Sequence, residues 1–162
     1  MNNNNIMNTK DAIRSKFAQV FVETKDKKRY KMLMCKDFEA KANIKTQDVP
    51  RMGSIVMGKQ ATTIELPFKM TIYKCTEIFD DIVSSFIETG AFPNFTIQCY
   101  NEDPDSGVGA SEKSFNDCIL DGDVLLSLGG SGDDFIEQEI SGFAGSYETK
   151  EKFTDPGYMT AG

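Results

Sequence analysis

A long alternating segment passes directly into a helical segment between Thr62 and Gly90, and this transition constrains the fold most. Apolar residues occupy every second position from Ile64 to Ile72, which is typical of a strand with one buried and one wet face. Past Thr76 the apolar residues recur in pairs at every fourth position, as in an amphipathic helix. We therefore expect a sheet with one short helix docked on its side or end.

The predicted helix spans residues 76–89. We expect Thr76 to cap its N-terminus and Gly90 to take the left-handed position after its last turn. Its apolar stripe, which includes Phe86, is expected to pack on the sheet, so that truncating Phe86 removes core volume. Four polar residues are predicted to form the outer face of the helix: Asp80, Asp81, Ser84 and Glu88.

Length and charge limit the possible classes of protein. A chain of 162 residues with 40% hydrophobic residues is long enough for one domain with a core. We divide it into a flexible N-terminal arm (1–16), a β domain (17–148) and a C-terminal extension (149–162). The net charge of −7 and the scattered cations argue against tight nucleic-acid binding. No apolar run reaches the roughly 20 residues of a membrane span, so we expect no membrane binding and a cytoplasmic location.

Other alternating segments predict further strands. They are a hairpin formed by residues 17–22 and 30–35, and then strands at 38–45, 92–99, 115–120, 124–128 and 136–140, with a tight turn at 121–123. The segment 38–45 is predicted to be one strand that buries Phe38, Ala40, Ala42 and Ile44. The pattern predicts a mainly β fold: an antiparallel barrel or sandwich with one flanking helix and a long loop between strands.

That long loop spans Thr46 to Gln60 and carries apolar residues beside cationic ones. One interpretation is a hairpin that continues both flanking strands. The other is an arm, mobile in the free subunit, that docks on a neighbouring subunit, because loops of this length usually have a function. The residues that would make the contact are Val49, Arg51, Met52, Ile55, Val56, Met57 and Lys59.

The sequence offers little to an active site. Histidine is absent, which removes the commonest general base and metal ligand. The four cysteines are far apart and are interpreted as buried free thiols. The loop from Asn101 to Ser114 lacks the glutamate that ends a calcium loop, and is interpreted as a solvated turn. Gly129–Gly132 lacks the lysine of a phosphate-binding loop. We expect no enzyme activity, no cofactor and no metal.

The chain resembles the tail tube proteins of contractile bacteriophage tails, in particular the core-tail family of PBSX-like prophages and phage-tail-like bacteriocins. The resemblance covers roughly residues 17–156 and rests on the order and spacing of several segments rather than on one motif. These are Phe38-Glu39-Ala40, Ile55-Val56-Met57-Gly58-Lys59, Met70-Thr71-Ile72-Tyr73-Lys74-Cys75-Thr76, Phe79, Pro93-Asn94-Phe95-Thr96-Ile97-Gln98, Phe143 and Phe153.

The resemblance implies a subunit that assembles with itself into hexameric rings, which stack into a tube inside a contractile sheath. The implied partners are the sheath, tape-measure, baseplate and tail-terminator proteins, with DNA only as transient cargo. Assembly would take place in the cytoplasm of a bacterial host, and the product would be the tail of a phage or phage-like particle. Two alternatives remain open: a tube protein of type VI secretion, and a stand-alone ligand-binding β-barrel.

Two strands are candidates for the wall of such a channel, because each has one wet polar face. The residues predicted to line the channel are Glu39, Lys41, Asn43, Glu65, Lys69 and Thr71. The outer face of the helix would then point toward solvent, the sheath or the next subunit, and the long loop toward the adjacent ring.

Overall fold

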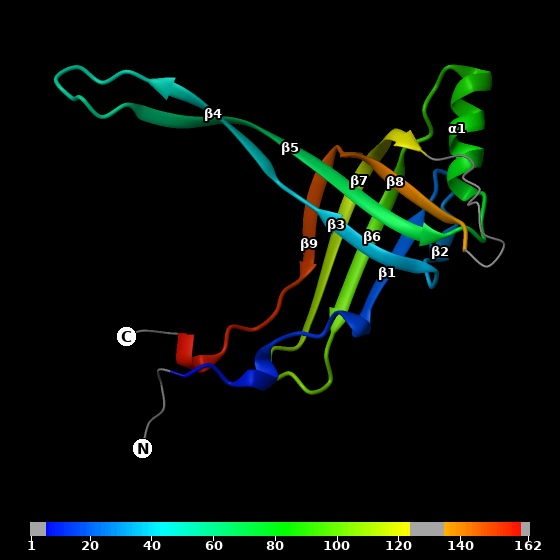
Figure 1. The fold of residues 1–162 in the computed structure, drawn as a ribbon, viewed down its shortest axis with the longest axis horizontal. Helices are drawn as coiled ribbons and strands as arrows, with labels where there is room; N and C mark the ends of the chain where they lie inside the picture. Colours follow the sequence, from blue (N-terminus) through cyan, green and yellow to red (C-terminus); the bar gives the residue numbers. More distant parts are fainter. Residues whose placement is uncertain (1–5, 124–134, 160–162) are drawn as a thin grey trace.

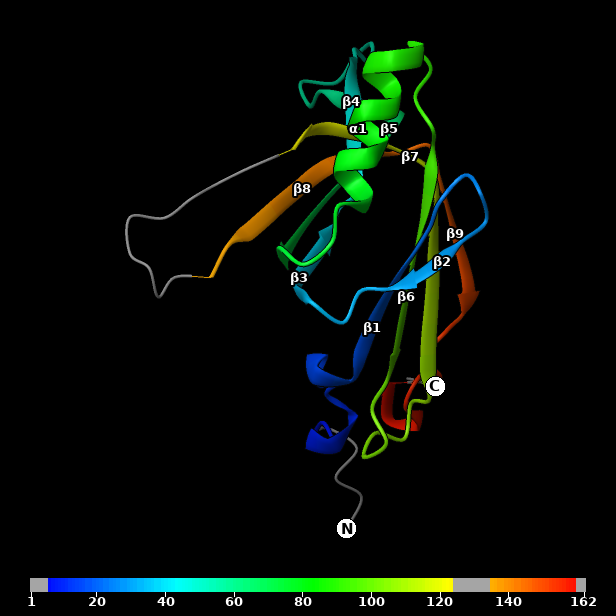
Figure 2. The same cartoon turned by 90° about the vertical axis from the view of Figure 1, so that its right-hand side faces the viewer.

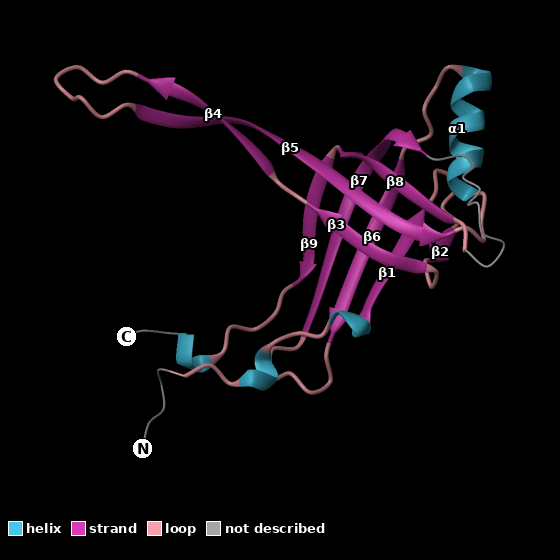
Figure 3. Cartoon of the chain, in the orientation of Figure 1, coloured by secondary structure: helices cyan, strands magenta, loops and turns pink. Residues whose placement is uncertain are grey.

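The structure is a computed structural model that describes residues 6–123 and 135–159. Nine strands and one α-helix dominate the described residues (Figures 1 and 3). The strands are β1 (Ala18–Glu23), β2 (Arg29–Lys31), β3 (Cys35–Ala40), β4 (Asn43–Val49), β5 (Gly58–Tyr73), β6 (Phe95–Glu102), β7 (Ala110–Asp123), β8 (Glu137–Ala144) and β9 (Ser146–Glu151). The helix α1 spans Ile78–Thr89, and three short 3-10 turns are η1 (Thr9–Asp11), η2 (Ser15–Phe17) and η3 (Gly157–Met159).

The strands form one curled antiparallel sheet in the order β2-β1-β6-β7-β8-β5-β3, with β4 added to β5 and β9 added to β7. The long strand β7 joins its two parts, since its first half pairs with β9 and its second half with β8. The part that contains β3, β5 and β8 curls over the part that contains β1 and β6 (Figure 2). The predicted mainly β antiparallel fold with one helix is confirmed, in the form of a half-barrel.

The core lies between the two parts of the sheet and is closed at one end by α1. Alternate residues of β5, including Phe68, Met70 and Ile72, are almost completely buried. They meet Ile97 and other residues of β6, while the helix contributes Phe79, whose ring lies 5.9 Å from that of Phe95. The alternation that predicted the strand therefore describes its buried half correctly.

The segment predicted as one strand over 38–45 is two strands, and that prediction is wrong. The chain breaks at residues 41–42 between β3 and β4, although both pair with the same continuous partner, β5. Beyond the break, no second layer among the described residues covers the sheet. Ala42 and Ile44 are therefore exposed, although the sequence alternates there as it does in β3.

The tight turn predicted at residues 121–123 is also wrong, because these residues continue β7. Gly122 has a φ of 90° at a register shift in the pairing with β8, so the glycine serves a bulge rather than a reversal. The strand predicted at 124–128 and the glycine turn at 129–132 lie outside the described residues. The predicted boundary of the β domain at residue 148 lies inside β9, and the division of the chain into three parts stays a prediction.

The helix begins two residues later than predicted, at Ile78. The hydroxyl of Thr76 still accepts the N–H of Ile78 at 3.4 Å, but Glu77 occupies the cap position without a side-chain bond. Gly90 has a φ of 72° and donates its N–H to Phe86, as the sequence predicts. None of the helices among residues 6–123 and 135–159 has the length and apolar character that crossing a bilayer requires.

Candidate assembly surfaces

A polar sheet face is formed by the sides of β3, β5 and β8 that point away from the core. Glu39 lies opposite Lys69 in the register, and Lys69 pairs with Glu139 at 3.0 Å. Lys41 pairs with Glu39 at 3.2 Å. The adjacent carboxylates raise the pKa of the Lys69 ammonium, because they favour its charged form. We call this ion-paired surface the polar sheet face.

The structure brings together four of the six predicted channel residues on or beside this face: Glu39, Lys41, Lys69 and Thr71. The other two, Asn43 and Glu65, lie opposite each other where β4 leaves the body, and Glu65 pairs with Lys45 at 2.9 Å. Sequence reasoning missed the contribution of β8. Glu137 and Glu139 alternate with buried residues of β8, and Glu137 pairs with Lys36 at 3.0 Å. Only the sheet register places the two glutamates beside β5.

The strands β4 and β5 project from the body as a two-stranded arm (Figure 1). We define the arm as residues 43–65 and its tip as residues 50–57. Residues 46–49 and 58–60 are paired strand, so the loop predicted over 46–60 is limited to the tip. The hairpin interpretation therefore describes the shape of the arm correctly, and whether the arm docks on a neighbour stays a prediction.

Both faces of the arm are exposed in the isolated chain. The side chains of Met52 and Ile55 at the tip are fully exposed, and Val56 and Met57 are more than half exposed. Arg51 donates to the carbonyl of Val56 at 3.1 Å and has no ion pair among the described residues. The predicted contact residue Val49 ends β4, and Lys59 pairs with Asp48 at 2.7 Å across the stem.

The outer face of α1 differs from the prediction at one position. Asp81, Ser84 and Glu88 are exposed, but Asp80 is partly buried beneath the helix. Its carboxylate accepts from the ammonium of Lys74 and, at 3.0 Å, from the amide of the buried Gln138. Asp80 therefore ties the helix to β8 and is not part of its outer face.

The apolar stripe of α1 is only half used by the core. Phe79 and Ile82 are buried, whereas the side chain of Phe86 is 46% exposed and that of Ile87 is 76% exposed. The expectation that Phe86 is a core residue is therefore wrong, because the last turns of the helix extend beyond the sheet. Phe86 contacts Phe92, with ring centroids 5.7 Å apart.

A clasp of charged groups joins the N-terminal segment to the β6–β7 connection, where a solvated turn was predicted. Asp103 is 2% exposed and accepts from the side chain of Arg14 at 2.8 Å on each carboxylate oxygen, and from two backbone N–H groups at 3.0 Å. The Arg14 guanidinium holds the pKa of this carboxyl well below its usual range. Tyr158 donates to Asp11 at 2.8 Å and ties the C-terminal segment to the same region. No local pattern signals this clasp, since its partners are 89 residues apart.

The cysteines are free, and they are less uniformly buried than predicted. Cys118 is buried and Cys35 and Cys99 are half-buried, but Cys75 is exposed at the end of β5. Burial raises the pKa of Cys35 to about 11 and that of Cys99 and Cys118 to about 12. Within residues 6–123 and 135–159, no group of three or more cysteines and carboxylates is arranged to hold a metal ion.

Comparison with known proteins gives consistent matches over most of the chain. A family model described as "Phage tail tube protein" matches residues 5–151. The phage-like element PBSX protein XkdM of Bacillus subtilis (strain 168) is 27% identical over 124 residues, which cover 76% of this chain and 84% of that protein. The uncharacterized protein YqbM of the same strain is 29% identical over 97 residues, covering 60% of this chain and 66% of that protein.

Solved structures with a similar fold include chains of a prophage baseplate and of a contractile injection system. A chain of the anti-feeding prophage baseplate aligns with a TM-score of 0.67 at 5% identity, covering 88% of this chain and 97% of that chain. A chain of an extracellular contractile injection system, the PVC sheath–tube complex in its extended state, aligns with a TM-score of 0.61 at 12% identity, covering 82% and 88%. At these identities the structural matches show the shared fold alone.

Proposed function

Because this chain belongs to the phage tail tube protein family and is a structural subunit of the tube in contractile tail-like systems, we propose that it forms stacked hexameric rings. The stacked rings form the conduit inside a contractile sheath. The subunit is a component of the tail of a phage or phage-like particle, and we place its assembly in the cytoplasm of a bacterial host. The observation that carries the ring proposal is the polar sheet face on one side of the half-barrel.

The polar sheet face supports a channel wall. It is exposed and ion-paired over β3, β5 and β8, while the opposite side of the same strands builds the core. Such a face is stable in water without a partner, so it suits a surface that stays wet after assembly. We propose that Glu39, Lys41, Lys69 and Thr71 face the lumen, with Asn43 and Glu65 at its edge.

The arm supports stacking. An isolated two-stranded hairpin is only marginally stable in water, and this one extends away from the core with an apolar tip. Each apolar side chain of the tip would gain on the order of 1.5 to 3 kcal/mol on full burial. We propose that the tip, with Val49, Arg51, Met52, Ile55, Val56, Met57 and Lys59, is buried on a neighbouring subunit of the adjacent ring.

Membership of the family supports the remaining partners, as does the likeness to chains of a sheath–tube complex and of a tube-terminating cap. We propose that the sheath contacts the outside of the tube through Asp81, Ser84 and Glu88 of α1, and that a terminator and a baseplate close its ends. The net charge of −7 would let DNA pass as transient cargo without holding it.

Electron microscopy of the purified protein tests the ring proposal directly. Rings or tubes with a central channel are expected. A monomer that stays monomeric at high concentration, and that retains a small molecule through purification, would favour a ligand-binding barrel instead.

Stacking is tested by replacing Met52 and Ile55 with aspartate, which should abolish tubes while the subunit still folds. The matched control is Ile87→Asp, which adds a charge at an exposed isoleucine of the helix and should leave tubes intact. Long tubes from the double aspartate variant would show that stacking does not depend on the tip.

The channel wall is tested by thiol labelling in a Cys75→Ser background, which removes the exposed native thiol. In assembled tubes, Glu39→Cys and Lys69→Cys should react with a small reagent and resist a bulky one. The control Asp81→Cys should react with both, because the helix lies outside the channel. Equal labelling of Lys69→Cys by both reagents in intact tubes would contradict the assignment.

A further inference from the structure

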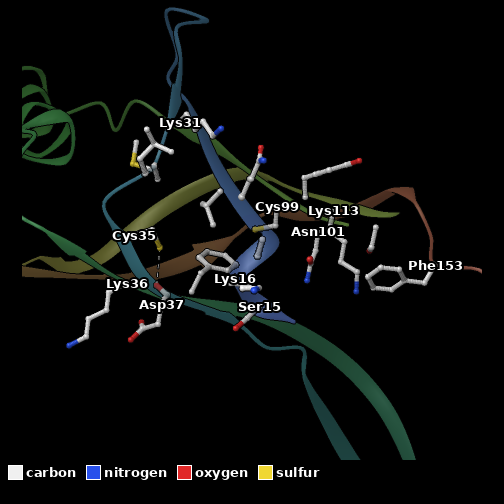
Figure 4. A pocket seen from close by; sticks show the side chains of 18 residues that line it. Ser15, Lys16, Lys31, Cys35, Lys36, Asp37, Cys99, Asn101, Lys113 and Phe153 are labelled. Atoms are coloured by element: carbon white, nitrogen blue, oxygen red, sulfur yellow. Dashed lines mark hydrogen bonds between the residues drawn. The ribbon is translucent and has the colours of Figure 1, made fainter. Parts of the chain in front are cut away.

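A groove of about 730 Å³ opens where the half-barrel is not closed, between β1 and β3 (Figure 4). β2 pairs with residues 21–23 of β1, and the N–H of Met32 donates to the carbonyl of Val20 at 2.8 Å, so residues 18–19 leave that edge open to the groove. The outer edge of β3 is not covered by a strand among the described residues. Both edges carry backbone groups without strand partners, which favour pairing with another extended chain. Val20, Met32 and Phe38 line the groove with apolar surface, and Leu33 beside them is 79% exposed.

One acceptor in this groove lacks a donor. The Oδ1 atom of Asn101 is buried and has no hydrogen-bond partner among the residues that the structure describes. Leaving such an atom unsatisfied is costly, so an occupant that brings N–H groups beside Asn101 would stabilise the site.

The cations of the groove are mostly engaged within the subunit. Lys36 pairs with Glu137 at 3.0 Å, Lys16 lies 5.1 Å from the ring centre of Phe17, and Lys113 lies 5.9 Å from that of Tyr147. Only the Glu137 carboxylate neutralises a lysine charge here, while the ring contacts hold Lys16 and Lys113 beside aromatic faces, so the apolar floor is the main attractive feature of the groove.

We propose that this groove receives the arm of a second copy of the chain, and this inference rests on the proposed stacking. The arm supplies what the groove lacks: exposed apolar side chains at Met52 and Ile55, the outer edge of β4 that no strand covers among the described residues, and the donors of Arg51. Arg51 carries five N–H groups, and its only hydrogen bond among the described residues is the one to the Val56 carbonyl.

The contact has to form between copies. The arm extends away from the body, and its tip lies far from β1, which borders the groove (Figure 1). A tip and a groove on different parts of one subunit make a heterologous contact, which propagates from copy to copy rather than closing a dimer. This is the symmetry that a ring or a stack of rings requires.

Paired cysteines test this inference in assembled tubes, in a background in which serine replaces the exposed Cys75 and the two groove thiols, Cys35 and Cys99. Ile55→Cys is combined with Leu33→Cys in the groove and, as a matched control, with Ile87→Cys on the helix, since Leu33 and Ile87 are 79% and 76% exposed. After treatment with a short bis-maleimide, the Leu33 pair should give a ladder of covalent multimers that extends past the dimer. The Ile87 pair should give none.

The outcomes separate the two proposals. Tubes that give no ladder with the Leu33 pair, or that give one with the Ile87 pair, would overturn the groove assignment and leave the tube function intact. Failure of the Cys75→Ser protein, which keeps the groove thiols, to form rings or tubes under any condition would overturn the proposed stacking itself. Ile55→Cys alone should give dimers at most, which excludes contacts between two tips as the source of the ladder.

Discussion

Gly142→Ala is expected to destabilise the subunit strongly, because β8 passes the backbone of β7 too closely for a side chain. A Cβ atom at Gly142 would lie 1.9 Å from the carbonyl oxygen of Ile119 and 3.0 Å from the ring of Phe68. The obstacle is backbone, so it cannot move aside as a flexible side chain does. The two strands would have to separate by more than an ångström beside the register shift of β7.

The expected cost is about 3 kcal/mol or more, at the upper end of the usual range for overpacked sites. That is a large part of the roughly 5 to 15 kcal/mol that stabilises a typical domain. Urea unfolding of the dissociated subunit, followed by circular dichroism, measures the change. Gly157→Ala is the matched control, because among the described residues no atom beyond its two chain neighbours lies within 4 Å of the added Cβ, and it should stay within about 0.5 kcal/mol of the parent. Equal unfolding midpoints for the two variants would refute the close approach of β7 and β8.

Three further predictions follow from burial and charge. In urea unfolding, Phe79→Ala should lower the free energy of unfolding by about 3 to 5 kcal/mol, whereas Phe86→Ala on the same helix should lower it by only about 1 to 1.5 kcal/mol, since Phe86 is 46% exposed. Equal losses for the two variants would contradict the position of the helix. The depressed pKa of Asp103 stabilises the fold at any pH above its unfolded value of about 4, and this contribution is lost as pH falls through the folded pKa. When the stability of Asp103→Asn is followed during acid titration, that loss should be missing, and a curve identical to that of the parent would contradict the argument. A disulfide reagent at pH 8 should label one thiol in a fast phase, and Cys75→Ser should abolish this phase, because burial raises the pKa of the other three thiols. A fast phase that persists in Cys75→Ser would show that another cysteine is the reactive one.

Local patterns predicted most of the elements, because alternation and helical spacing are local properties. The strand from Ile64 to Ile72, the helix that follows it and the stop at Gly90 were all predicted from residues that are neighbours in sequence. The family was predicted in the same way, from short segments in a fixed order, and the match over residues 5–151 confirms it.

The errors arose where the same pattern has two physical settings. Ile44 and Ile64 alternate with polar residues as Phe68 and Met70 do, yet the first pair lies on the arm and the second in the core. Alternation tells which side chains share a face, but only the rest of the fold decides whether another layer covers that face. The groove and the clasp at Asp103 depend on contacts between distant residues, which no local pattern reports.

The single strand β5 belongs to both the core and the arm, and this continuity has a mechanical consequence. Its 16 residues span about 50 Å, with β3 and β8 holding the buried half from both sides. In the proposed stack, where a neighbour binds the arm, tension along the tube runs through one backbone into that doubly paired segment. Hydrogen bonds perpendicular to the pull are then strained together in shear rather than opened one by one. A stretched assembly should therefore part where arms leave their neighbours, with the subunits still folded.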